Sequence, residues 1–93
     1  MKVNMEIRVT GRVQGVNFRS SARDEAKRLG IIGTVQNADD GSVLIYARGE
    51  EQKMAAFLEW CKKGPAFAMV TGLELAEIAD KGWKDFQIVR SPR

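Results

Sequence analysis

The segment 11–19, which reads GRVQGVNFR, holds the residues of this chain that are best placed to bind an anion. It joins an alternating run, expected to form a strand, to a run with helical spacing. A glycine-bearing loop at such a junction can turn successive backbone N–H groups toward one point, where the helix dipole adds positive potential. The same glycines suit an ordinary strand-to-helix connection, so spacing alone leaves both interpretations open. The segment lacks the third glycine of a dinucleotide-binding fingerprint and the Gly-Lys-Ser/Thr of a P-loop.

Arg19 ends this segment and stands at the start of the expected helix. A guanidinium group is a planar fork of N–H donors that can hold two phosphate oxygens at once. Most arginines are ordinary surface residues, and that is the alternative for Arg19.

The inventory of reactive side chains excludes several classes of enzyme. The sequence has no histidine and a single cysteine, Cys61. Serine–histidine and cysteine–histidine catalysis, histidine or multi-cysteine zinc sites and intrachain disulfides are therefore excluded. Cys61 falls on the apolar face of an expected helix and is interpreted as a core thiol. An enzyme made from this chain would use arginine, amides, hydroxyls, carboxylates and its backbone.

Length and charge set further limits. Ninety-three residues make about one domain, so we expect a single unit over 1–93. Residues 1–30 carry seven basic and three acidic residues of a chain with net charge +3, which is a local positive field or simply solvated surface. The charges are too sparse for a nucleic-acid-binding arm. Because no apolar run is long enough for a signal peptide or a membrane span, we expect a cytoplasmic protein.

The regions on either side of segment 11–19 differ in the spacing of their apolar residues. Residues 3–10 alternate apolar and polar side chains, which predicts a strand with one buried face. From Phe18 the apolar residues are spaced four, four and three positions apart, which predicts a helix over 18–29 closed by Gly30.

The downstream elements are expected in chain order: a strand over 33–38, a turn over 39–42, a strand over 43–48, a helix from 49–51 to Gly64-Pro65, a strand over 69–78 and a short strand over 86–89. Asp40-Gly41 between two β-type runs is a strong hairpin signal. The order β-α-β-β-α-β plus a terminal strand is typical of the α+β, ferredoxin-like sandwich. We expect an antiparallel sheet covered on one face by two helices, a fold that by itself identifies no function.

The whole chain resembles the acylphosphatases. The segment 11–19 closely resembles the signature of that family, and Gly33-Thr34-Val35-Gln36-Asn37 followed by Asp40-Gly41-Ser42-Val43 resembles its second segment. The resemblance implies hydrolysis of acyl phosphates, the mixed anhydrides of a carboxylic acid and phosphate, to a carboxylate and inorganic phosphate.

The same resemblance implies roles for individual residues. The phosphoryl-binding arginine of the family falls on Arg19, and the asparagine that positions the attacking water falls on Asn37. The loop amides that cradle the phosphoryl group are those of Gln14, Gly15, Val16, Asn17 and Phe18. No metal, cofactor or covalent enzyme intermediate is implied, and we expect a monomer.

The expected strand over 33–38 gives Asn37 the parity of Val35, whose side chain should face the helices. An asparagine fits that face only at the end of the strand, where water or substrate can pair with it. The turn beginning at Asp39 puts Asn37 at such an end. The alternative is a residue that ends the strand with a local backbone hydrogen bond.

Two features depart from the family pattern. Asn17 stands where the family usually has glycine, and its side chain could crowd the anion, although asparagine tolerates positive φ better than most residues. Asp39 and Asp40 follow Asn37 and could repel a dianionic substrate.

Two other functions are weighed against this one. A family member could bind phosphate without turning over a substrate. An RNA-binding module on the same fold would need stacking aromatics on its third strand, which here offers only Tyr46. No nucleic-acid partner is therefore expected.

Overall fold

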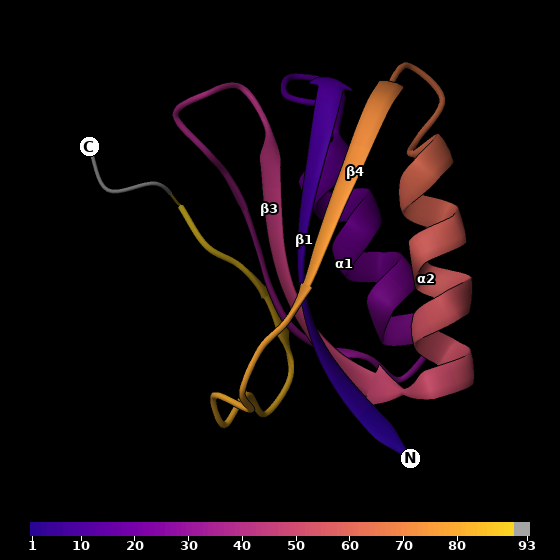
Figure 1. The fold of residues 1–93 in the computed structure, drawn as a ribbon. Coiled ribbons are helices and arrows are strands. Elements are labelled where there is room, and N and C mark those ends of the chain that lie inside the picture. Colours follow the sequence, from indigo (N-terminus) through magenta and orange to yellow (C-terminus); the bar gives the residue numbers. More distant parts are fainter. Residues whose placement is uncertain (91–93) are drawn as a thin grey trace.

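The computed structural model describes residues 1–90, which form a five-stranded sheet with two helices on one face (Figure 1). The order of the strands across the sheet is β4-β1-β3-β2-β5. The elements are β1 (Lys2–Arg12), α1 (Phe18–Arg28), β2 (Ile32–Asn37), β3 (Val43–Glu50), α2 (Glu51–Lys63), β4 (Met69–Glu77) and β5 (Phe86–Ile88). The predicted ferredoxin-like sandwich is confirmed.

The four strands β1 to β4 form the predicted antiparallel sheet, and the short extra strand β5, whose direction was not predicted, makes the whole sheet mixed. β1 pairs antiparallel with β3 and β4, and β2 pairs antiparallel with β3, but β5 runs parallel to β2. The difference arises because the long segment between β4 and β5 carries the chain across the sheet to its other edge, which local sequence patterns do not reveal.

The alternating pattern of β1 buries one face as predicted. Ile7 and Val9 are fully buried beneath the helices. The strand continues two residues beyond its expected end, to Arg12, because the pairing with β4 shifts register between Thr10 and Gly11. This bulge lets β1 remain hydrogen-bonded until the loop to α1 begins.

The hairpin between β2 and β3 forms at the predicted Asp-Gly turn. Ala38 N–H donates to the carbonyl oxygen of Ser42 at 2.9 Å, and Gly41 adopts φ 92°. β3 runs on to Glu50, so Gly49 and Glu50 belong to the strand, and the second helix begins at Glu51, the last of the three residues predicted to open it.

The helices bury the predicted apolar stripes against the sheet. α1 contributes Phe18, Ala22 and Ala26, while α2 contributes Met54, Phe57 and Cys61. α1 packs mainly on β2 and β5. Its first residues, Phe18 to Ser20, lie at the end of the sheet where β2 finishes at Asn37. Figure 1 shows the β2–β3 turn, the loop after β1 and the final described residues at this same end.

Within residues 1–90, neither helix has the length and apolar character needed to cross a membrane.

Candidate active site

A cavity of about 430 Å³ opens at the end of the sheet where β2 finishes and α1 begins. Four parts of the chain meet there: the loop after β1, the first turn of α1, the end of β2 and the segment after β5. The described residues that line it are Val13, Gly15, Asn17, Phe18, Arg19, Ser20, Asn37, Ile88 and Arg90. None of them is acidic, so the cavity is suited to an anion.

The backbone of the loop turns sharply at two positions. Gly15 and Asn17 both adopt positive φ, at 76° and 66°. This left-handed region favours glycine and tolerates asparagine, which explains how Asn17 can stand at the position expected to hold glycine. A loop with left-handed residues directly before a helix N-terminus is a common setting for backbone anion binding.

The Asn17 side chain is held by the first turn of α1. Its Oδ1 accepts a hydrogen bond from Ser20 Oγ, while the Asn17 carbonyl oxygen accepts from Ser21 N–H at 3.2 Å. The side chain therefore has a defined partner on the helix, although Asn17 and Ser20 both remain part of the cavity lining.

Arg19 lies in the first turn of α1, half-buried in the cavity wall. No carboxylate among residues 1–90 forms an ion pair with it. The arginine is thus at the mouth of the loop, where the sequence predicted it, and its positive charge is not neutralised by a neighbouring described acid.

Asn37 is the last residue of β2 and lines the same cavity. It shares the parity of Val35, which is fully buried against the helices. The location predicted from strand parity is therefore correct, and the structure brings Asn37 and Arg19 together from elements that are separated in sequence.

Gln14 takes a different position from the rest of the loop. Its Nε2 donates hydrogen bonds to the carbonyl oxygens of Ala38 and Ser42, both at 2.8 Å. These bonds tie the loop to the β2–β3 turn that follows Asn37. Neither Gln14 nor Val16 lines the cavity, so for them the proposed contribution to phosphate binding rests on backbone N–H groups alone and stays a prediction.

The turn itself is fastened on its other side. Arg8 donates from Nη1 to Ser42 Oγ at 2.8 Å and lies 3.2 Å from Asp40 Oδ2. Hydrogen bonds from the Ser42 hydroxyl and backbone N–H, with the nearby Arg8 charge, lower the pKa of Asp40 below its usual value. Asp40 is hydrogen-bonded within the turn, and neither it nor Asp39 lines the cavity. Neither carboxylate therefore borders the space in which a dianionic substrate would lie.

Sequence reasoning missed Arg90 and Ile88 as parts of the site. Phe86 in β5 is buried on the helix side of the sheet, and Ile88 and Arg90 follow it at two-residue intervals. An alternating strand therefore puts these two residues on the same side. That parity was the available signal. It could be used only with the knowledge that β5 lies beside β2, and that pairing is a long-range feature.

The side chains of the site do not resemble a metal centre. Among residues 1–90, no three side chains of histidine, cysteine, aspartate and glutamate lie close enough together to hold an ion.

Cys61 is fully buried in the core, as predicted, and desolvation raises the pKa of its thiol strongly.

Comparison with known proteins gives a consistent result. A family model described as acylphosphatase matches residues 5–88. The chain is 48% identical over 84 residues to an acylphosphatase of Thermotoga maritima, covering 90% of this chain and 93% of that protein. Its fold matches the crystal structure of acylphosphatase from Bacillus subtilis with a TM-score of 0.90 and 40% identity, covering 96% and 99% of the two chains. An acylphosphatase from Coxiella burnetii matches with a TM-score of 0.91 and 34% identity, covering 95% and 93%.

Proposed function

The chain belongs to the acylphosphatase family and is an enzyme that hydrolyses acyl phosphates, and from this premise we propose that Arg19 holds the phosphoryl group while Asn37 orients the attacking water. The observation that carries the proposal is the shared cavity. Around it lie the guanidinium of Arg19, which has no carboxylate partner among residues 1–90, the N-terminus of a helix and the strand-end amide of Asn37.

Each part of the cavity has a chemical task in this proposal. The guanidinium of Arg19 and the N–H groups of residues 14–18 bind the phosphoryl oxygens. The side-chain amide of Asn37 holds a water in line with the bond to be broken. The water oxygen bonds to phosphorus, the bond between phosphorus and the acyl oxygen breaks, and the carboxylate leaves with that electron pair. Both protons of the water stay with the phosphate, which is released as H₂PO₄⁻.

This reaction does not need a histidine. A carboxylate is a good leaving group, so no general acid has to protonate it. Arginine stays protonated and does not act as a base. Catalysis then rests on positioning and on stabilisation of negative charge, which dominate other phosphoryl transfers as well.

The proposal also covers the cellular location, oligomeric state, cofactors and partners of the enzyme. We propose a cytoplasmic monomer that works without metal or cofactor and without a nucleic-acid partner. The described lining of the cavity supports metal independence, since it holds no carboxylate, imidazole or thiolate that could anchor an ion. Tyr46, the one aromatic residue of β3, has Lys81 Nζ 5.2 Å from its ring centroid and offers no row of stacking aromatics.

The test is release of inorganic phosphate from benzoyl phosphate, measured with and without the protein and in the presence of excess chelator. We expect protein-dependent hydrolysis that the chelator leaves unchanged and that inorganic phosphate inhibits competitively. Saturable phosphate binding without hydrolysis would support the binding-only alternative. Loss of the protein-dependent rate in chelator would contradict metal independence.

A further inference from the structure

The segment after β5 brings a second guanidinium group to the cavity. Val35 lies opposite Ile88 in the parallel pair of β2 and β5, and Val89 N–H donates to the Val35 carbonyl oxygen at 2.9 Å. Asn37 ends β2 two residues after Val35, and Arg90 follows the end of β5 two residues after Ile88. Both Asn37 and Arg90 line the cavity.

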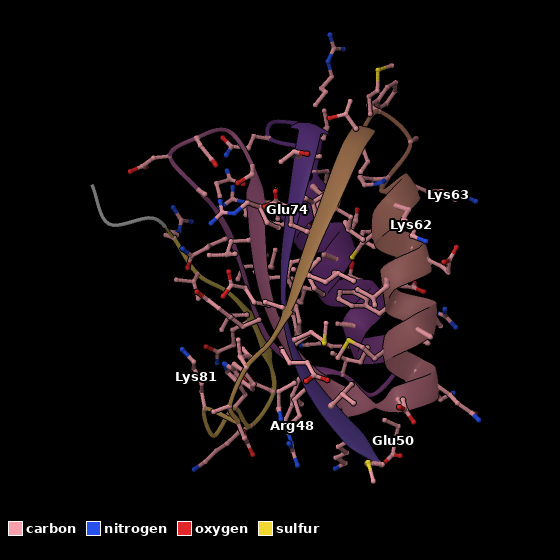
Figure 2. All side chains as sticks on the ribbon, in the orientation of Figure 1. Arg48, Glu50, Lys62, Lys63, Glu74 and Lys81 are labelled. Atoms are coloured by element: carbon pink, nitrogen blue, oxygen red, sulfur yellow. The ribbon has the colours of Figure 1, made fainter. Side chains whose placement is uncertain are left out.

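Three described arginines, Arg12, Arg19 and Arg90, form no ion pair with a carboxylate of residues 1–90, and of these Arg19 and Arg90 line the cavity. Arg8, Arg23, Arg28 and Arg48 each have a carboxylate partner, and Figure 2 shows Arg48 at the sheet with Lys81 on the segment that carries its partner Asp80. Among residues 1–90, Arg90 has none.

Arg90 therefore adds to the cavity of Arg19 a second positive charge that has no carboxylate partner in the described part of the chain. Two guanidinium groups in one cavity without an acidic lining residue repel each other, and an anion bound between them removes that repulsion.

From this arrangement we infer that Arg90 is a further substrate-binding residue, which contacts the phosphoryl oxygens from the β5 side while Arg19 and the loop contact them from the α1 side. The inference rests on the proposed function. In an in-line displacement the water and the acyl oxygen lie on opposite sides of phosphorus. Arg90 lines the cavity together with Asn37, which is proposed to hold the water, so the inference places Arg90 on the water side of phosphorus and not beside the leaving acyl group.

This placement predicts an effect that does not depend on the acyl group. Arg90→Gln should raise KM for benzoyl phosphate and for succinyl phosphate, whose acyl chain carries a carboxylate, by a similar factor of about ten. The inhibition constant of inorganic phosphate should rise by the same factor. Arg90→Lys should recover part of the loss, because it keeps the charge but not the fork.

Because Arg90 is exposed, its contribution should be sensitive to salt. The ratio of KM values between Arg90→Gln and the unmodified protein should therefore shrink as ionic strength rises. Arg28→Gln is the matched control, since it removes an exposed arginine in the last turn of α1, at the far end from the cavity. Its KM and phosphate inhibition constant should stay within about twofold of the unmodified protein.

Three results would overturn the inference: an unchanged phosphate inhibition constant in Arg90→Gln, an effect seen only with succinyl phosphate, or an equal effect of Arg28→Gln.

Phosphate binding measured by calorimetry separates this inference from the proposed function. If the unmodified protein binds phosphate but hydrolyses neither substrate, the proposed function fails while the contribution of Arg90 is still measured. If both substrates are hydrolysed and Arg90→Gln binds phosphate normally, the inference alone fails.

Discussion

The side-chain amide of Gln14 donates a hydrogen bond to the carbonyl oxygen of Ala38, the residue directly after Asn37, at 2.8 Å. A second bond of 2.8 Å runs from the same nitrogen to the Ser42 carbonyl oxygen across the turn. One side chain thus joins the loop that is proposed to bind the phosphoryl group to the strand end that is proposed to hold the water. The distance between these two parts of the site depends on it.

Replacing Gln14 should therefore impair catalysis through geometry. Gln14→Glu puts a carboxylate against two carbonyl oxygens, so we expect it to be worse than Gln14→Ala in both stability and kcat. Loss of two neutral hydrogen bonds in Gln14→Ala should cost about 2 kcal/mol in the free energy of unfolding. Denaturant unfolding and steady-state kinetics measure the two effects. Gln87→Ala, an exposed amide on β5, is the control, and equal losses in it would contradict the special role of Gln14.

Arg19→Ala should lower turnover of benzoyl phosphate by at least about a hundredfold, because a charged donor to the transition state is lost. Arg19→Lys should recover only part of the rate, since an ammonium group lacks the paired donors of a guanidinium. Arg23→Ala, one turn further along α1 and paired with Asp24, should keep nearly normal activity. A folded Arg19→Ala protein with near-normal kcat would show that the site assignment is wrong.

Asn37 should affect a different kinetic constant. A residue that orients only the water contributes little to substrate affinity, so Asn37→Ala should lower kcat sharply and leave KM and phosphate inhibition nearly unchanged. Asn37→Asp should be at least as poor, because a carboxylate repels the phosphoryl dianion. Normal kcat with a raised KM would instead assign Asn37 to substrate binding.

Asn17 tests the backbone of the loop. Its φ of 66° suits glycine at least as well, so Asn17→Gly should retain phosphate binding and stability to within about 1 kcal/mol, despite losing the contact with Ser20. A β-branched residue is strained there, and Asn17→Val should lose about 1–2 kcal/mol and bind phosphate more weakly. Thermal unfolding and the phosphate inhibition constant give both comparisons. Equal behaviour of the two variants would mean that this conformation is unimportant.

Cys61 makes stability depend on alkaline pH. Burial raises the pKa of its thiol in the folded protein, whereas the unfolded chain loses this proton near a pKa of about 8.5. Below that pH both states are protonated and the thiol adds no pH dependence. Above it only the unfolded state loses the proton, so unfolding becomes easier by about 1.4 kcal/mol per pH unit. Unfolding titrations between pH 7 and about 10 should show a shallower decline in Cys61→Ala. Parallel declines would exclude the thiol as a cause.

The predictable parts of the site are those that depend on local periodicity. The location of Asn37 at a strand end followed from the parity of β2 and the turn after it, and the location of Arg19 at a helix start followed from the change of period at Phe18. That Asn37 belongs to the site was implied only by the resemblance to the acylphosphatases. The positive φ at Asn17 agreed with the known tolerance of asparagine for that region.

The parts that could not be predicted depend on contacts between distant segments. The Gln14 side chain bonds to residues 24 and 28 positions away, and no spacing rule links a loop amide to those carbonyl groups. Arg90 enters the site only because β5 pairs parallel with β2, whereas neighbouring strands in the pattern suggested an antiparallel sheet.

The three residues of β5 also cover a sheet edge that could otherwise pair with other copies of the protein. Without them, β2 would form an edge of the sheet and present an unpaired row of N–H and C=O groups to other chains. The opposite edge, β4, carries Glu74 and Glu77, and charged side chains discourage such pairing. A chain that failed to dock β5 would therefore be prone to edge-to-edge aggregation, and the pairing that prevents this also holds Ile88 at the cavity.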